Sequence, residues 1–124
     1  LDKFFLSKYK NVVIYGKINN LNNVIKNSIC GLCNVKISTG FQSKTLTYMS
    51  YGIPTIVSIN SFSSTNFKKN KEVLVYKNNE ELTKKVFHLI KNKKIANQLS
   101  INSQKIIKKK YSKNKVLSSY NKII

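Results

Sequence analysis

Residues 37–57 constrain the fold more than any other part of this 124-residue sequence. They read Ile-Ser-Thr-Gly-Phe-Gln-Ser-Lys-Thr-Leu-Thr-Tyr-Met-Ser-Tyr-Gly-Ile-Pro-Thr-Ile-Val. Gly40 predicts a turn, and Ser43 is a favourable N-cap for a helix over residues 44–51. A turn that leads into a helix in this way gathers backbone N–H groups at the helix N-terminus, where a phosphate group can bind.

The same stretch predicts where the helix ends and a strand begins. Gly52 is typical of a helix end, and Pro54 restricts the residue before it to an extended backbone. A buried strand is therefore expected at residues 55–57. One face of the preceding helix is expected to carry three residues at helical spacing: Leu46, Met49 and Ser50.

Short apolar runs alternate with helical patterns along the rest of the chain. Further strands are expected at residues 11–15, 29–37 and 72–76, and a loop at residues 58–70. Further helices are expected at residues 2–8, 21–28 and 79–90, and over two later stretches that carry Leu99 and Tyr120. This alternation predicts an α/β fold, a Rossmann-like parallel sheet with helices on both faces. We expect one domain over residues 1–124, with a helical tail at residues 105–124.

The net charge of +19 comes from 23 basic and four acidic residues, and every basic residue is lysine. A dedicated nucleic-acid binder usually includes arginine, whose planar fork contacts phosphate and guanine through two hydrogen bonds. We therefore expect no nucleic-acid partner. Peripheral contact with an anionic membrane is the better functional interpretation, because a lysine near such a surface adds about 1 kcal/mol of attraction.

The two cysteines, Cys30 and Cys33, form a lone C-x-x-C pair. A zinc site needs two more ligands, and the chain has a single histidine, His88, and no third cysteine. The surrounding sequence favours a buried strand, where free cysteines are ordinary core residues. We expect no metal site, no catalytic role for His88, and a reducing, cytoplasmic setting.

Three turns are expected at the carboxyl ends of the strands, where ligands bind in an open parallel sheet. The middle turn, residues 38–44, has the chemistry for a diphosphate. The N–H groups of residues 42–45 would lack helical partners, and Lys44 would add a positive charge. A plain strand-to-helix turn explains the same residues, and their physical chemistry alone leaves both interpretations open.

Four stretches agree in order and spacing with one known family. Asn11-Val-Val-Ile-Tyr-Gly16 is similar to its strand and glycine turn. Residues 39–54 are similar to its signature, an acid-Gly-Phe-Gly followed by Leu-Glu-Ala-Met-Ala-x-Gly-x-Pro. Residues 71–82 match its next strand and helix, and residues 106–112 its closing segment. On these stretches the chain resembles the C-terminal, donor-binding domain of GT-B glycosyltransferases of the group 1 (family 4) type.

The resemblance implies a retaining transferase that takes a sugar from a nucleotide-diphosphate donor without a metal or another cofactor. It places the donor sugar and diphosphate against seven consecutive residues: Thr39, Gly40, Phe41, Gln42, Ser43, Lys44 and Thr45. It also places Thr47 at the ribose and Gly16, Lys17 and Ile18 near the nucleotide base. The resemblance assigns no catalytic residue in this chain.

The chain departs from the family at two positions. The family usually carries two glutamates eight positions apart, and here Thr39 and Thr47 take their places. A threonine can accept a hydrogen bond, but it cannot stabilise positive charge. Because the chain begins at Leu1, and the family's acceptor-binding domain and first C-terminal strands have no counterpart, we expect a fragment, a partial GT-B C-terminal domain inactive alone.

The expected function is glycosyl transfer from a nucleotide-diphosphate sugar to a saccharide or lipid-linked acceptor in surface polysaccharide synthesis. The expected location is the cytoplasm, at the inner face of the membrane. The alternative is a non-catalytic or degenerate module of the same fold that binds a nucleotide sugar, which the two threonines favour. A sugar-nucleotide epimerase is a weaker alternative, because that class needs acids and a histidine near its site.

Overall fold

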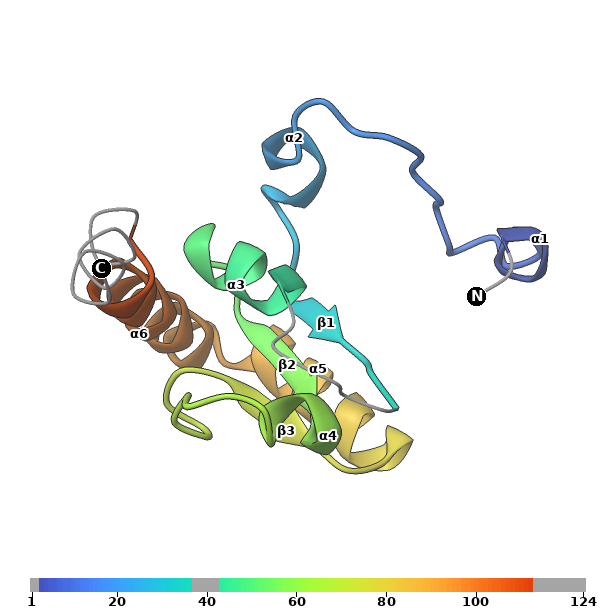
Figure 1. The fold of residues 1–124 in the computed structure, drawn as a ribbon. Helices are drawn as coiled ribbons and strands as arrows, with labels where there is room; N and C mark the ends of the chain where they lie inside the picture. The colour runs from blue at the N-terminus through green and yellow to red at the C-terminus, as the bar shows by residue number, and fades with distance from the viewer. Residues whose placement is uncertain (1–2, 37–42, 113–124) are drawn as a thin grey trace.

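A parallel sheet forms the centre of the computed structural model, which describes residues 3–36 and 43–112 (Figure 1). Its strands are β1 (Gly31–Cys33), β2 (Thr55–Ser58) and β3 (Leu74–Tyr76), in the order β1-β2-β3. The helices are α1 (Lys3–Leu6), α2 (Asn22–Ile25), α3 (Ser43–Ser50), α4 (Ile59–Phe62), α5 (Asn79–Lys91) and α6 (Lys93–Lys110). Both strand pairs are parallel, so the expected α/β Rossmann-like fold is confirmed.

Each face of the sheet has its own apolar core, because successive strand residues point to opposite sides. On one face Val57 and Val75 pack with Met49 of α3, which is fully buried. On the other face Ile56 and Leu74 pack with residues of α5 and α6. Helices therefore cover both faces, as expected from the sequence.

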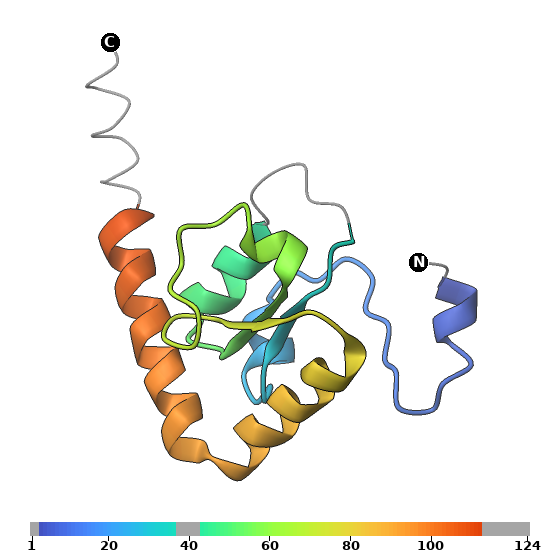
Figure 2. The ribbon, with the colours of Figure 1, turned by 90° about the horizontal axis from the view of Figure 1, so that it is seen from below.

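Helix α6 contributes to both cores. Leu99, in its first half, belongs to the core beneath α5, whereas Ile106 and Ile107 pack against the opposite core beside α3. Figure 2 shows α5 and α6 diverging from the corner where they meet. Separate helices were expected at residues 79–90 and around Leu99, and this separation is confirmed, because α5 ends at Lys91 and α6 begins at Lys93.

The end of α3 is fixed by Gly52, which adopts the left-handed conformation at φ 71°. The N–H of Gly52 donates to the carbonyl of Met49 at 3.0 Å, which ends the helix. The Ser100 hydroxyl of α6 donates to the Gly52 carbonyl. The predicted glycine stop is therefore confirmed, and it also ties α3 to α6.

The predicted strand at residues 11–15 is wrong. This segment runs without regular structure between α1 and α2 (Figure 1), and Val13 is 71% exposed. An apolar run becomes a strand only when a neighbouring strand pairs its backbone groups. Within the described residues the sheet pairs only β1, β2 and β3, so this run has no such neighbour.

Three smaller expectations also need correction. Residues 58–70 are not a continuous loop, because Ser58 caps the short helix α4. The buried face of α3 contains Met49 and, one turn before it, Thr45. Ser50 lies outside this face and is exposed. Strands β1 and β3 are shorter than the strands predicted at residues 29–37 and 72–76. Ile29, which was predicted in the first of these, precedes β1 and is half exposed.

The helical tail expected at residues 105–124 is only partly described. Helix α6 contains its beginning and extends to Lys110, while residues 113–124 lie outside the described residues. None of the helices in the described ranges is long and apolar enough to cross a membrane.

Candidate functional site

The first turn of α3 lies at the edge of the sheet where the parallel strands end. Gly52 and the residues after it lead from α3 directly into the amino end of β2. Helix α3 therefore runs against the strand direction, and Ser43 at its start lies at the carboxyl edge. Ligands bind at this edge in open parallel sheets.

The first turn of α3 is suited to an anion. Ser43 and Lys44 are exposed, and the turn contains no acidic residue. The first N–H groups of any α-helix have no partner inside the helix, and the helix dipole makes this end positive. In the part of the chain that the structure describes, Lys44 makes no ion pair. Its ammonium group is therefore available to a negatively charged ligand.

The Thr45 side chain is buried, whereas a side chain that binds a diphosphate must be accessible at the start of α3. Thr45 is 1% exposed, and its hydroxyl oxygen has no hydrogen-bond partner among the described residues. The side chain points into the core, so the Thr45 hydroxyl is not presented to a ligand at this edge. The other expected donor-site residues, Thr39, Gly40, Phe41 and Gln42, lie outside the described residues.

Thr47 lies one turn further along α3 and is half-buried. Its hydroxyl donates to the carbonyl of Ser43 at 3.0 Å, so its proton is already used within the helix. The oxygen can still accept a hydrogen bond from a sugar hydroxyl. It has no charge to offer such a ligand.

Gly16, Lys17 and Ile18 were expected near a nucleotide base. They belong to the irregular segment between α1 and α2, where Gly16 and Lys17 are exposed and Ile18 is half-buried. Figure 1 shows this segment leading away from α3. The structure therefore does not bring these three residues together with the first turn of α3.

Ser58, the last residue of β2, links the segments that meet at the carboxyl edge of the sheet. The Ser58 hydroxyl donates to the carbonyl of Val35 at 3.0 Å and lies 3.4 Å from the Val35 nitrogen. The same oxygen accepts from the Ser61 N–H at 3.3 Å, and the Ser61 hydroxyl lies 3.0 Å away. Ser58 is thus both the N-cap of α4 and the link between β2 and the segment that follows β1.

Asn60 adds a second link across the same edge, because its amide donates to the carbonyl of Lys36. Together Ser58 and Asn60 hold residues 35 and 36 at the carboxyl edge. Sequence reasoning missed both residues. A signal was present for Ser58, since serine is one of the favoured N-cap residues.

Of the two cysteines, Cys30 lies just before β1 and Cys33 is the last residue of that strand. Cys33 is buried and Cys30 is half-buried, and both are free thiols. Burial raises the pKa of the Cys30 thiol, which disfavours the thiolate that redox chemistry needs. Among the described residues no group of histidine, cysteine or acidic side chains could hold a metal ion. The expectation that the pair serves as core residues fits this placement.

Burial also affects Tyr76, the last residue of β3. Desolvation, and secondly the charge that Cys33 would carry as a thiolate, raise the pKa of the Tyr76 hydroxyl. This hydroxyl has no hydrogen-bond partner among the described residues. His88 is exposed and lies on α5, where the side-chain amide of Asn92 contacts its ring.

An open parallel sheet, covered on both faces and carrying an exposed helix start at its carboxyl edge, defines an α/β domain of the Rossmann-like class. The profile of a glycosyl transferase-like family matches residues 4–120. The chain therefore belongs to that glycosyl transferase-like family, and the match supports a GT-B-type glycosyltransferase domain. A comparison with curated proteins gave no match.

Replacing Ser58 by alanine tests the serine link. Ser58→Ala removes an N-cap and leaves backbone groups of Val35 and Ser61 without their partner, so we expect a loss of about 1–2 kcal/mol in the free energy of unfolding. Ser63→Ala is the matched control, because that exposed hydroxyl only donates to Asn60 within its own turn. Urea unfolding followed by circular dichroism measures both. Equal stability of the two variants would contradict the proposed link.

Proposed function

We propose that this domain binds a nucleotide-diphosphate sugar and takes part in glycosyl transfer to a saccharide or lipid-linked acceptor. The observation that carries this proposal is the start of α3, which presents Ser43 and Lys44 at the carboxyl edge of the parallel sheet. Membership of the glycosyl transferase-like family supports a transferase in general. The donor class is our own inference from the anion-binding chemistry of this edge, and the acceptor class is inferred from the family resemblance of the sequence.

The reaction is a substitution at the anomeric carbon of the donor sugar. The acceptor oxygen forms a bond to that carbon while the bond from the carbon to the diphosphate oxygen breaks. Negative charge then grows on the leaving diphosphate. The positive end of α3 and the ammonium of Lys44 would stabilise this charge, and they would do so without a metal ion.

The seven residues from Thr39 to Thr45 are proposed to surround the sugar and the diphosphate. Ser43 and Lys44 would contribute side chains, and Thr45 its backbone N–H, since its side chain is buried. Thr47 is proposed to accept a bond from a ribose hydroxyl. If Gly16, Lys17 and Ile18 bind the nucleotide base, the segment between α1 and α2 that carries them must take a different position relative to α3 from the one in the structure.

A second candidate is a module that binds a nucleotide sugar without transferring it. The threonines at positions 39 and 47 favour this candidate, because neither can supply the charge of the glutamates that the family usually carries. The hydroxyl of Thr47 is also engaged by the carbonyl of Ser43. Binding and transfer must therefore be measured separately.

The setting that we propose is the cytoplasmic face of a membrane used in surface polysaccharide synthesis. Its support is the net charge of +19, which attracts the protein to anionic lipids. We propose no nucleic-acid partner, because arginine is absent from the sequence.

Replacing Lys44 by alanine tests the diphosphate site. Lys44→Ala removes the one charged side chain in the first turn of α3, so we expect nucleoside diphosphates to bind about tenfold more weakly. Lys91→Ala, at the exposed end of α5, removes the same charge at a distance and should leave affinity unchanged. Isothermal titration with UDP, GDP and ADP measures both variants. A loss of affinity that is equal in the two variants would refute a specific role for Lys44.

Replacing Thr47 by glutamate separates the two candidate functions. In a working transferase, a carboxylate at this position should strengthen donor binding modestly, about twofold to fivefold, because it can accept bonds from the ribose hydroxyls. Thr47→Gln is the control that keeps the length but not the charge. The readouts are nucleotide-sugar affinity and release of the nucleoside diphosphate. A Glu variant that binds the nucleotide sugar but releases no diphosphate supports the non-catalytic candidate.

A further inference from the structure

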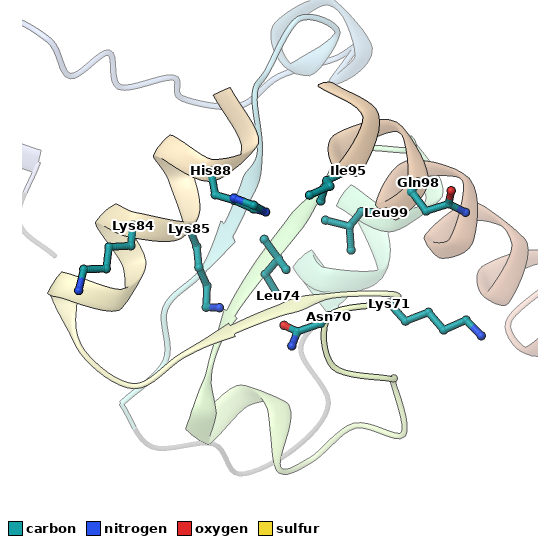
Figure 3. Close-up of a pocket in the computed structure, with 9 residues that line it drawn as sticks. All are labelled: Asn70, Lys71, Leu74, Lys84, Lys85, His88, Ile95, Gln98 and Leu99. Atoms are coloured by element: carbon teal, nitrogen blue, oxygen red, sulfur yellow. The ribbon is translucent and has the colours of Figure 1, made fainter. Parts of the chain in front are cut away.

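A hollow of about 600 Å³ lies between α5, α6 and the turn that precedes β3 (Figure 3). It is close to the amino end of β3, whereas the first turn of α3 lies at the carboxyl edge of the sheet. It is therefore separate from the proposed donor site. Its lining residues are Asn70, Lys71, Leu74, Lys84, Lys85, His88, Ile95, Gln98 and Leu99.

The floor of this hollow is apolar. Leu74 of β3 and Leu99 of α6 form it, and they are 6% and 2% exposed. Ile95 stands beside Leu99 at the start of α6 and is partly exposed, at 37%. Figure 3 shows Leu74, Ile95 and Leu99 turned toward one another across the space between the two helices. An apolar group placed here would be removed from water.

The rim of the hollow is basic. Three lysines and one histidine contribute to it, and its lining contains no carboxylate. Lys84 is paired with Glu80 at 2.7 Å. No ion pair is found for Lys71 or Lys85 among residues 3–36 and 43–112, so both charges are free to attract an anion.

The two other carboxylates on this side of the sheet are used by backbone groups. Glu72 is buried and accepts from the Lys68 N–H at 2.8 Å. Glu81 accepts from the Lys77 N–H at 2.9 Å. Among the described residues neither forms an ion pair with Lys71 or Lys85.

His88 adds a hydrogen-bond donor without needing a charge. The side-chain amide nitrogen of Asn92 lies 3.3 Å from Nδ1 of His88 and donates to the His88 carbonyl at 3.1 Å. In the tautomer in which Nδ1 accepts from this amide nitrogen, the ring proton lies on Nε2. Figure 3 shows the His88 ring directed over Leu74 toward α6. Its Nε2–H can therefore donate to an anion in the hollow.

We propose that this hollow binds the phosphate group of an amphiphilic ligand. The phosphate would contact Lys85 and His88, and the apolar part of the ligand would cover Leu74, Ile95 and Leu99. The Lys71 side chain extends outward in Figure 3 and would reach the phosphate in another rotamer. Phosphate matches the rim because it accepts several charge-assisted hydrogen bonds at once. An anionic phospholipid and a soluble alkyl phosphate share this chemistry. The proposal does not depend on glycosyl transfer.

The test uses the full chain labelled with ¹⁵N and titrated with dodecyl phosphate below its micelle concentration, and with inorganic phosphate. We expect dodecyl phosphate to shift signals of Leu74, His88 and Ile95. Lys85→Glu should weaken its binding about tenfold, because the charge at the rim is reversed. Lys94→Glu is the matched control, since it changes the net charge equally and Lys94 does not line the hollow. Lys71→Glu, at an exposed position, repeats the test should the Lys85 variant unfold.

Vesicles of phosphatidylcholine, with and without an equal amount of phosphatidylglycerol, identify the source of the phosphate. If Lys85→Glu lowers binding to the anionic vesicles more than Lys94→Glu does, the ligand is a membrane lipid. If only dodecyl phosphate binding responds, the ligand is a soluble amphiphile. The proposal is overturned if signals at the hollow do not move, if the Lys85 and Lys94 variants behave alike, or if inorganic phosphate binds as tightly as dodecyl phosphate.

Discussion

The burial of β2 between two parallel neighbours is the constraint on which the rest of the structure depends. All four of its residues are buried, and Ile56 and Val57 belong to the two apolar cores on opposite faces of the sheet. Because β2 is paired on both sides, helices must cover both faces of the sheet. This requirement places α3 antiparallel to the strands and so presents its first turn at the carboxyl edge.

Much of this architecture can be predicted from local sequence signals. Gly52 and Pro54 mark where α3 ends and β2 begins. Asn78, followed by two acidic residues in the first helical turn, marks the start of α5. The failure at residues 11–15 has a different origin. Their composition favours a strand, but a strand also needs a partner, and pairing between distant segments leaves no local signal in the sequence.

The candidate site was predictable to a similar extent. The start of α3 at Ser43 follows from the turn and cap residues, and the exposed position of Lys44 agrees with its expected role. The burial of Thr45 could not be read from the motif, because the orientation of a helix about its own axis is decided by packing against the sheet. The links made by Ser58 were hidden for a related reason, since they join residues 23 positions apart.

The central claim is that the first turn of α3 binds a diphosphate, and amide chemical shifts of the ¹⁵N-labelled chain test it most directly. Titration with UDP and GDP, against inorganic sulfate, compares a diphosphate ligand with a simple anion. The account predicts that the nucleotides shift the amides of Ser43, Lys44 and Thr45 before any others, at concentrations where sulfate does not. Shifts confined to the hollow between α5 and α6, or no shifts at all, would contradict it.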